Sequence, residues 1–470
     1  MSTRPQTALM AAISDVETIG TGDHLASDMA ARIERLPLTS WQIRARFIVG
    51  TATFFDAFDA LAIAYVLPVV VLLWQLSPQQ AGILISGGFF GQLFGALFFG
   101  WFAERFGRLK SLLGSIAIFG ALSLACAFSW SYASLLVCRI AQGFGLGGEV
   151  PVAATYINEL APARARGRFV LLFELVFPCG ILAASVLGLW LVPNFGWQAI
   201  FIAGAFPALL VFVLQRLLPE SPRWLAAKGR RAEAEAAMRV VEAGTERAFR
   251  GSLPAPELSV NAPLKSSSWS DLFGLLYLRR TLVVWVIWFA TYFVNYGLAT
   301  WMPTLYRTVF HLPLATALRY QLITNVATLC SSFVCAMLID RTGRRAWFAA
   351  AFTGSAAALL ALWYTGADTA LHVLLLGTLS NMCIGTMSLA VYLYTPELYP
   401  TRTRALGVGT ATAWLRLASI IGPNIVGVLV ARSDLASVFL VFGLVALSAA
   451  VVVQLFAVET KGRVLEEISP

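Results

Sequence analysis

Long apolar runs alternate with short polar links along most of this chain. A helix needs about 20 mostly apolar residues to cross a bilayer. The pattern therefore predicts twelve membrane-spanning helices, six on each side of a longer polar stretch. These predicted spans cover residues 47–73, 81–103, 111–130, 133–157, 169–191, 197–217, 281–305, 314–339, 346–365, 370–394, 405–430 and 435–457.

Two groups of six spans predict an all-α integral membrane fold made of two pseudo-symmetric six-helix bundles, the pattern of duplicated transporters. We expect the bundles at 47–217 and 281–457, joined by a linker at 218–280 that contains short helices. An N-terminal tail (1–46) and a C-terminal tail (458–470) complete the chain. The N-terminal tail has no apolar core of signal-peptide length, so we expect it to stay in the cytoplasm.

Composition supports a membrane protein. Apolar residues make up 58% of the chain and charged residues 13%, against roughly a quarter charged in ordinary soluble domains. The net charge of +9 does not indicate a nucleic-acid partner, because the Arg and Lys residues concentrate in the links between spans. The six cysteines lie inside apolar runs without metal-ligand spacing, so we expect no metal, no cofactor and no disulfide framework.

Basic residues occupy alternate links, which predicts the orientation. Arg105, Arg108 and Lys110 lie between spans 2 and 3, whereas the links on the other side carry few, with Arg307 and Arg432 as late exceptions. Both termini and the linker are therefore expected on the cytoplasmic side of the cell inner (plasma) membrane.

A short charged motif occurs once in each half. The link after span 2 reads GWFAERFGRLK (100–110), and the link after span 8 reads DRTGRR (340–345). Both place an acid before Arg, then Gly, then a further basic residue. This repeat resembles the signature between helices 2 and 3 of the major facilitator superfamily, although Glu104 stands where that family usually has Asp.

Four further motifs resemble the sugar-porter and organic-ion-transporter branches of that superfamily: YINELAP (156–162), PESPRWL (219–225), TPELYPTRTRALGVG (395–409) and ETKGRVLEEI (459–468). Acids at helix ends can pair with Arg on neighbouring helices, and such a latch would stabilise one of two conformations. The alternative is that these charges only set the topology. The predicted latch residues are Glu104, Arg105, Arg108, Glu159, Arg166, Glu220 and Arg223, and in the second half Asp340, Arg341, Arg344, Glu397 and Arg404.

Ionisable residues inside spans are functional candidates because burying them in a bilayer is costly. Asp56 and Asp59 lie three residues apart, on one face of span 1, and span 4 contains Arg139 and Glu149. Proton-coupled sugar porters carry an acid at the Asp59 position, so the resemblance implies an Asp59–Arg139 pair whose loss would let Asp59 bind a proton. A static salt bridge is the alternative. Asp56 is a second proton candidate, and Glu149 is either a coupling or a structural acid.

Arg416 in span 11 indicates the substrate. Its segment, WLRLASIIGP (414–423), resembles organic anion transporters, and GLGGEVPVAATYINE (145–159) resembles bacterial niacin transporters. A guanidinium can hold a carboxylate through two hydrogen bonds. The alternative partner for Arg416 is an acid of span 5 such as Glu174.

Aromatic and amide residues of span 7 predict a substrate wall, since stacking surfaces with a few polar groups suit a flat ligand. Each could instead be ordinary packing. The Gln pair and Gln-rich helix 5 of sugar porters are missing, which argues against a hexose. The predicted wall residues are Trp288, Tyr292, Asn295 and Tyr296, with Tyr65, Asn325, Asn381, Tyr392 and Trp414 from other spans.

Together these features predict a proton-coupled symporter of a small aromatic carboxylate, such as nicotinate or a benzoate-like acid, that works by alternating access. Another organic ion, a sugar or drug efflux is the alternative, and a non-transporting membrane sensor is the reading from another class. The sequence shows no nucleophile–base arrangement and no phosphate-binding loop, so we do not expect an enzyme. We expect a monomer whose partners are an organic anion, protons and the lipid bilayer.

Overall fold

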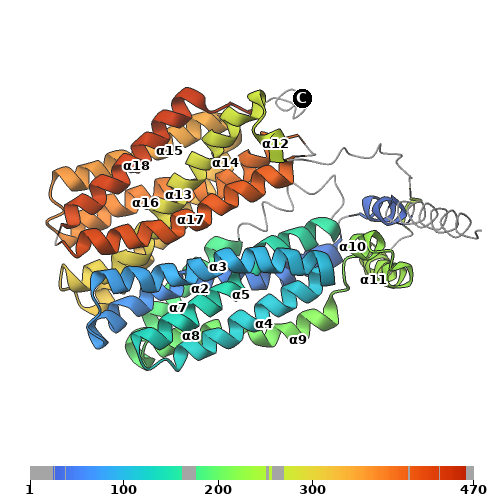
Figure 1. Cartoon of the computed structure of the whole chain (residues 1–470), viewed down its shortest axis with the longest axis horizontal. Helices are drawn as coiled ribbons and strands as arrows, with labels where there is room; N and C mark the ends of the chain where they lie inside the picture. Colours follow the sequence, from blue (N-terminus) through green and yellow to red (C-terminus); the bar gives the residue numbers. More distant parts are fainter. Residues whose placement is uncertain are drawn as a thin grey trace, which may run out of the picture.

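The computed structural model describes residues 25, 27–37, 39–160, 176–249, 253–256, 269–400, 403–432 and 434–461, and its elements are helices (Figure 1). The first half contains α2 (Ser40–Leu73), α3 (Pro78–Phe106), α4 (Arg108–Ala127), α5 (Tyr132–Leu160), α7 (Val176–Phe195), α8 (Gln198–Gly204) and α9 (Pro207–Leu217). Then come α10 (Pro222–Ala227) and α11 (Arg231–Phe249). The second half contains α12 (Trp269–Leu272), α13 (Leu275–Thr308), α14 (Leu314–Thr342), α15 (Arg344–Tyr364), α16 (Ala370–Glu397), α17 (Arg404–Val430) and α18 (Leu435–Phe456).

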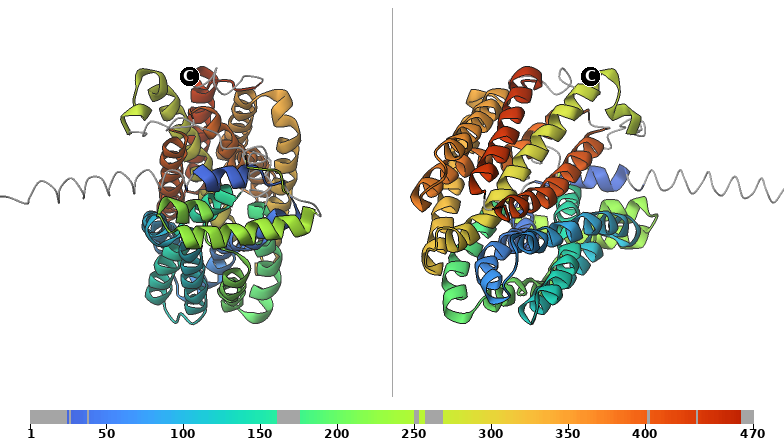
Figure 2. Two further views of the ribbon diagram at one scale, coloured as in Figure 1. Left: turned by 90° about the vertical axis from the view of Figure 1, so that its right-hand side faces the viewer. Right: turned by 60° about the vertical axis from the view of Figure 1, so that its left-hand side comes forward.

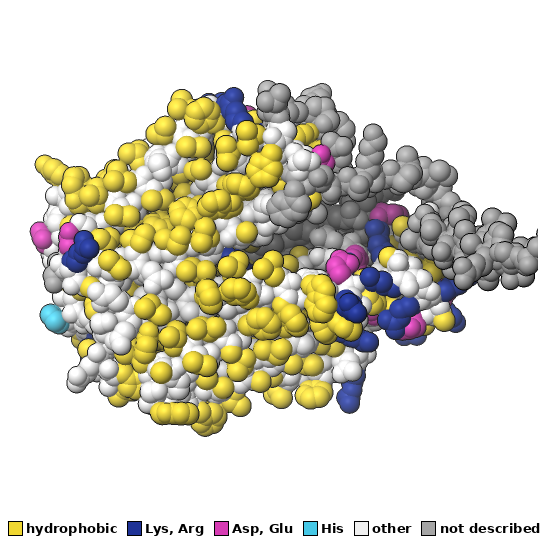
Figure 3. All heavy atoms as spheres, in the orientation of Figure 1, with side chains coloured by type: hydrophobic (Ala, Val, Ile, Leu, Met, Phe, Trp, Pro, Cys, Tyr) yellow, Lys and Arg dark blue, Asp and Glu magenta, His cyan; other side chains and the backbone are white. Residues whose placement is uncertain are grey.

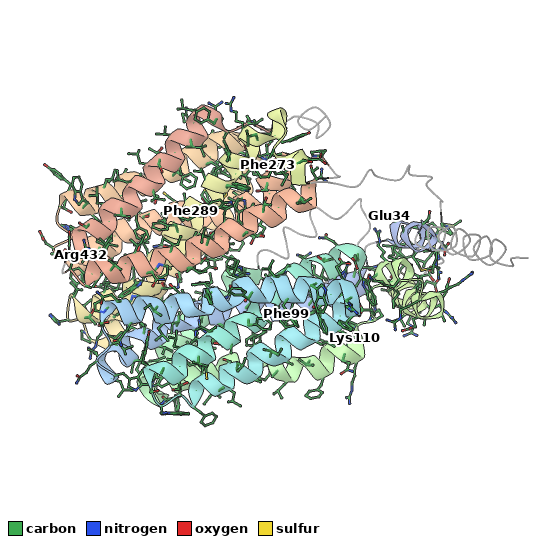
Figure 4. All side chains as sticks on the ribbon, in the orientation of Figure 1. Glu34, Phe99, Lys110, Phe273, Phe289 and Arg432 are labelled. Carbon is green, nitrogen blue, oxygen red and sulfur yellow. The ribbon has the colours of Figure 1, made fainter. Side chains whose placement is uncertain are left out.

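The two halves form two bundles whose long helices run in roughly the same direction (Figures 1 and 2). The short helices α10 and α11 lie beyond one end of the first bundle, which we call the linker end. The opposite end, where a short link joins α2 to α3, is the loop end. Figure 4 places Glu34 and Lys110 toward the linker end and Arg432 at the loop end.

Among the described residues, eleven helical segments are long and apolar enough to cross a membrane. The twelfth span of the fold is α5, whose 29 residues suffice in length but include Arg139, Gln142 and Glu149. The predicted span 197–217 is present as two helices, because the turn at Ala205 and Phe206 separates α8 from α9. The prediction of two six-helix bundles is confirmed.

Glycines allow α3 and α5 to pack backbone to backbone. A Cβ atom added to Gly91 would lie 1.9 Å from the carbonyl oxygen of Ile140, and one added to Gly143 would lie 2.0 Å from that of Gly88. Close approach of this kind drives helix association in lipid, where apolar burial alone gives no advantage. The polar helix α5 is thereby enclosed within its bundle.

The outer surface of both bundles is largely apolar (Figure 3). Large side chains such as Phe94, Leu97 and Trp101 of α3 are 49%, 70% and 53% exposed. In water such a surface would promote aggregation, whereas acyl chains solvate it. The exposed apolar belt therefore agrees with a chain that crosses the membrane many times.

The N-terminal segment is more ordered than a tail. Residues 27–34 are helical and pack against α11, where Arg32 and Arg35 contact Glu242 at 2.6 and 2.5 Å. In addition, α2 begins at Ser40, seven residues before the predicted start of the span, because Thr39 and Gln42 form a capping box. The boundary at 46 therefore falls inside a helix.

The packing of α3 on α5 gives a matched pair of substitutions in one helix. Gly91→Ala should lower the free energy of unfolding by about 1–3 kcal/mol, because the new methyl group clashes with fixed backbone. Gly100→Ala should be neutral or slightly stabilising, since no atom lies within 4 Å of the new Cβ. Thermal unfolding of both purified variants measures the difference, and equal melting temperatures would contradict the packing described.

Candidate functional site

A central cavity of about 110 Å³ lies between the two halves. It is set midway along the bundles, since Arg416 is near the middle of α17. Six of the predicted wall residues and one predicted proton-site candidate contribute to its lining. The six wall residues are Tyr292, Asn295, Tyr296, Asn325, Asn381 and Tyr392, and the acid is Asp56; Arg416, predicted to bind the substrate, also lines the cavity.

The halves are joined tightly between the cavity and the loop end. The Ser86 hydroxyl of α3 donates to the carbonyl of Ile420 at 2.8 Å, and the Asn424 amide donates to the Ser86 hydroxyl at 2.7 Å. Farther toward the loop end, a Cβ on Gly427 would lie 2.6 Å from the carbonyl oxygen of Pro78. These contacts close the route from the cavity to the loop end.

Toward the linker end the halves separate. Among the described residues, the other side-chain hydrogen bonds between the halves come from Asn325 and Arg416, at the level of the cavity. Figure 1 shows the helices of the two halves diverging from the loop end toward the linker end. The cavity therefore faces the linker end in this conformation.

Arg416 reaches across from α17 to the first half, where its Nη1 donates a hydrogen bond to Oε1 of Gln92 on α3. Asp56 of α2 lines the same cavity. Its carboxyl group is buried, its Oδ1 atom has no hydrogen-bond partner among the described residues, and it lies within electrostatic range of Arg416 and Asp59. An acid and a base from opposite halves thus share one small polar space.

Asp59 has a different environment although it is one turn away. Its Oδ2 accepts a hydrogen bond from Arg139 at 2.8 Å and its Oδ1 accepts one from Gln142 at 2.7 Å. Arg139 also donates to Gln142 at 2.8 Å. All three side chains are buried, and none lines the cavity. The predicted Asp59–Arg139 contact is present, as part of a closed group of three.

Aromatic rings form a continuous stack along one face of α13. Trp288 stacks on Tyr292 with ring centroids 5.7 Å apart, and Tyr292 stacks on Tyr296 at the same distance. Phe89 of the first half contacts Tyr296 at 4.9 Å. Spacing of four residues places all three rings on one face of α13. The rings of Tyr292 and Tyr296 reach the cavity.

Amide side chains fix the polar part of the wall. Asn295 donates to the Ser388 hydroxyl at 3.0 Å, and Asn325 donates to the Ser185 hydroxyl at 2.7 Å and to Tyr65 at 3.4 Å. Asn381 donates to a carbonyl of its own helix. These bonds orient the amides. The Asn325 oxygen also accepts a hydrogen bond from Gln321 at 3.2 Å, whereas the oxygens of Asn295 and Asn381 have no described donor and can accept one from a ligand.

Three predicted wall residues do not line the cavity. Trp288 is fully buried and donates to Thr395 at 2.8 Å, and Tyr65 lies behind Asn325. Trp414 packs against Trp285. Glu149 is also outside the lining: it is buried and accepts a hydrogen bond from Thr53 at 2.9 Å. Periodicity places a residue on a face, but it does not say which neighbour covers that face.

Sequence reasoning missed Gln92 and Ser388, which hold Arg416 and Asn295 in place. Gln92 could have been recognised from the sequence, because an amide side chain within an apolar span indicates a polar contact there, as it did for Asn325. Glu174, the alternative partner for Arg416, lies outside the described residues. Within the described part of the chain, no three His, Cys, Asp or Glu side chains are grouped as metal ligands would be.

Charged residues at the linker end of the first half form a network. Arg108 contacts Glu104 at 2.8 Å and Glu159 at 3.1 Å. Glu220 accepts hydrogen bonds from the backbone N–H groups of Leu109 and Ser221 at 3.0 and 2.9 Å. The carboxylate of Glu220 therefore caps the first turn of α4, where the helix dipole favours negative charge.

The second half repeats this arrangement. Arg344 contacts Asp340 at 2.8 Å and Glu397 at 3.2 Å. Glu459 accepts hydrogen bonds from the N–H groups of Arg344 and Arg345 at 2.9 and 3.1 Å. The two networks match residue for residue, and each joins helices of its own half.

Other predicted latch residues have separate contacts. Arg223 pairs with Glu34 at 3.0 Å, and Arg404 donates to the carbonyl of Pro396. Arg105 lies over the Trp101 ring, while Arg341 is exposed and accepts a hydrogen bond from Lys461 through its carbonyl. Arg166 lies outside the described residues. Among the described residues, the ion pairs of these networks join helices within one half and do not link the two halves in this conformation.

Comparison with known proteins places these features in context. The model of the family described as "Sugar (and other) transporter" matches residues 48–470. The niacin transporter NiaP of Acinetobacter baylyi is 35% identical over 446 residues, covering 94% of this chain and 99% of that protein. Organic cation/carnitine transporter 7 of Arabidopsis thaliana is 28% identical over 469 residues, covering 91% and 93%.

Solved structures share the fold. The xylose transporter XylE of E. coli, in a partially occluded inward open conformation, superposes with a TM-score of 0.71 at 20% identity, covering 91% of this chain and 100% of that one. At this identity the likeness concerns the fold alone.

Asp56 and Asp59 allow one substitution to be compared in two environments. Asp59→Asn should lower the free energy of unfolding by about 3–5 kcal/mol, because Arg139 loses its buried counter-charge. Asp56→Asn should leave stability nearly unchanged or raise it, since no described hydrogen bond to Oδ1 is lost. Thermal unfolding of the two variants in detergent tests this, and an equal loss in both would contradict the assignment.

Proposed function

Because the chain belongs to the "Sugar (and other) transporter" family of major facilitator proteins, we propose that it is a symporter that carries a small aromatic carboxylate together with a proton. Nicotinate and benzoate-like acids are the proposed substrates. The observation that supports the proposal best is that Arg416 and Asp56, from opposite halves, face one small cavity. The choice of nicotinate as a substrate is also supported by the similarity to the niacin transporter NiaP.

Arg416 would bind the carboxylate of the substrate. A guanidinium holds a carboxylate through two parallel hydrogen bonds, and such charge-assisted bonds are about twice as strong as neutral ones. In this conformation Arg416 donates a hydrogen bond to Gln92. The substrate anion would replace Gln92 as the acceptor of that hydrogen bond. The rings of Tyr292 and Tyr296 offer stacking surfaces for a flat substrate.

The size of the cavity favours a small substrate. Its volume is about 110 Å³, below the roughly 300–1,000 Å³ of pockets for drug-sized ligands. A single aromatic ring with a carboxylate is of suitable size, whereas a large drug would require the halves to separate further.

Asp56 would carry the proton. An ionised Asp56 and a substrate carboxylate compete for the positive charge of Arg416, since both interact with it inside a low-dielectric space. Protonation of Asp56 removes that competitor and its repulsion of the incoming anion. Anion and proton would therefore enter together, which is the requirement for symport.

Asp59 is the less suitable proton carrier in this conformation. Both of its oxygens already accept hydrogen bonds from Arg139 and Gln142, and the group does not reach the cavity. We assign Asp59, Arg139 and Gln142 a structural role, in which their hydrogen bonds hold α2 against α5. A coupling role for Asp59 in another conformation stays a prediction.

Alternating access would follow from the arrangement of the halves. Basic links predict that the linker end is cytoplasmic, so a cavity closed toward the loop end would face inward. Rocking of the halves would open the loop-end contacts around Ser86 and Asn424 and bring the two linker-end networks together. The inner membrane of a bacterial cell is the proposed location.

An organic cation is the second candidate substrate. Asp56 could hold a cation, and an organic cation transporter is among the relatives. Arg416 opposes this reading, because a cation beside Asp56 would also lie beside a guanidinium. A sensor without transport would bind ligand but not exchange it.

Substitution of Arg416 tests the substrate class by uptake into proteoliposomes, with an inwardly directed proton gradient as the driving force. We expect radiolabelled nicotinate or benzoate to accumulate with the wild-type protein. Arg416→Ala should weaken binding about 10- to 100-fold, corresponding to the 1.5–3 kcal/mol of hydrogen bonds to a charged group, and Arg416→Lys should recover only part of it. Uptake of either acid at the wild-type level by Arg416→Ala would exclude the carboxylate assignment.

Substitution of Asp56 separates proton coupling from substrate binding. Asp56→Asn mimics the protonated acid, so counterflow exchange of labelled nicotinate should persist while accumulation driven by a proton gradient is lost. Asp368→Asn, at an exposed acid of the loop end, is the control and should retain accumulation. If Asp56→Asn still accumulates nicotinate against its gradient, another group carries the proton.

A further inference from the structure

A second cavity, of about 630 Å³, lies at the linker end between the first turns of α2 and one side of α11. It is separate from the central cavity, with which it shares no lining residue. Its wall has three arginines and no acid. The lining residues are Ser40, Trp41, Arg44, Arg239, Val240, Ala243, Gly244, Arg247 and Ala248.

The three arginines come from both elements. Arg44 projects from α2, and Arg239 and Arg247 lie two turns apart on α11, with Ala243 between them. In the described part of the chain none of the three makes an ion pair. Arg239 donates a hydrogen bond to the backbone carbonyl of Glu235 at 3.4 Å.

Nearby acids are occupied elsewhere. Glu242 of α11 is bound by Arg32 and Arg35, and Glu235 is bound by Arg32 at 2.9 Å. Burial opposes ionisation of Glu242, yet hydrogen bonds from Arg32 and Arg35 lower the net pKa of that carboxyl below its usual value. Glu235 and Glu242 therefore pair with the N-terminal segment, Glu233 pairs with Arg230, and no acid of α11 forms a described ion pair with the arginines of the cavity.

Small residues of α11 create the space. The ring of Trp41 packs on the backbone of Gly244, where an added Cβ would lie 2.4 Å from the ring. Ala243 and Ala248 flank that contact. Large side chains at these positions would fill the volume between the guanidinium groups, so this stretch of α11 leaves room for a ligand.

Lipid-facing side chains adjoin the cavity. Ile43 and Phe47 of α2 flank Arg44 in the sequence and are 49% and 67% exposed. Apolar side chains so exposed on a spanning helix contact acyl chains, whereas arginines beside them reach the headgroup layer. The cavity thus lies where a phosphate at the membrane surface would be met.

We propose that this cavity is a binding site for a phosphate group, with Arg44, Arg239 and Arg247 as its ligands. Guanidinium groups bind phosphate oxygens through paired hydrogen bonds, and arginine is favoured where such recognition is needed. The bound anion would relieve the repulsion among three like charges and join α11 to α2. The headgroup of an anionic phospholipid supplies such a phosphate, with its acyl chains beside Ile43 and Phe47, and a soluble phosphate ester supplies the same chemistry.

Binding to the purified full-length protein tests the site, with native mass spectrometry and thermal shift as readouts. The probes are dioleoyl phosphatidylglycerol, dioleoyl phosphatidylcholine and sn-glycerol 3-phosphate. The test variant is Arg44→Gln/Arg239→Gln/Arg247→Gln. The control, Lys110→Gln/Arg216→Gln/Arg231→Gln, removes the same charge from exposed residues at the same end but outside the cavity.

We expect phosphatidylglycerol to bind the wild type and the control at least about tenfold more tightly than the test variant, and to raise the melting temperature of the first two. Tight binding of sn-glycerol 3-phosphate with the same dependence on the variant identifies a soluble ester as a sufficient ligand; binding of phosphatidylglycerol alone identifies a lipid site. Equal losses in both variants, or no preference for either phosphate probe over phosphatidylcholine in the wild type, would overturn the proposal. Should the triple variant fold poorly, Arg247→Glu, at an exposed helix position, is compared with Arg231→Glu by the same criteria.

Discussion

Removing a charged side chain from water costs several kcal/mol per ion unless partners replace the lost hydration, and this constraint organises the centre of the molecule. Asp59 and Arg139 meet it in large part, because both Asp59 oxygens and Nη1 of Arg139 are hydrogen-bonded within the group that Gln142 completes, although Nε of Arg139 has no partner among the described residues. The glycines of α3 and α5 allow the backbones to approach so closely that this group is enclosed. The polar helix α5 can therefore cross the membrane within its bundle although its composition alone would not favour it.

Asp56 and Arg416 meet the same constraint only in part. They line the central cavity together, and within the described part of the chain they form no direct ion pair; Arg416 is instead hydrogen-bonded to the neutral amide of Gln92. A site of this kind can accept an anion and a proton at small cost, because the groups that would bind them are not already saturated. Asp59 and Asp56 lie one helical turn apart on α2, but only Asp59 forms a described ion pair. We therefore assign Asp59 and Arg139 to the structural scaffold, and Asp56 and Arg416 to the proposed transport chemistry.

Much of the fold followed from the sequence, because spans, basic links and repeated motifs each have a direct physical cause. The correspondence between Glu104–Arg108 and Asp340–Arg344 was visible as a repeat, and the structure shows how Glu220, a predicted latch residue, and Glu459 complete it by capping the following helices. The wall of the cavity was predicted less completely. Trp288 and Tyr65 are on the expected helices but are covered by Thr395 and Asn325, and a single sequence does not specify such tertiary neighbours. The same limit explains why Asp56 and Asp59, which share a helical face, could not be assigned different environments in advance.

Linkage between proton and anion is the central claim, and it is measured most directly without a membrane. Nicotinate is added to the purified protein in weakly buffered solution, and the change in pH gives the protons bound per anion. Because Asp56 and the anion are coupled through Arg416, binding should take up protons in the wild type and in an Asp368→Asn control, and take up none in Asp56→Asn. Proton uptake that persists in Asp56→Asn, or nicotinate binding to the wild type without any proton uptake, would contradict the account.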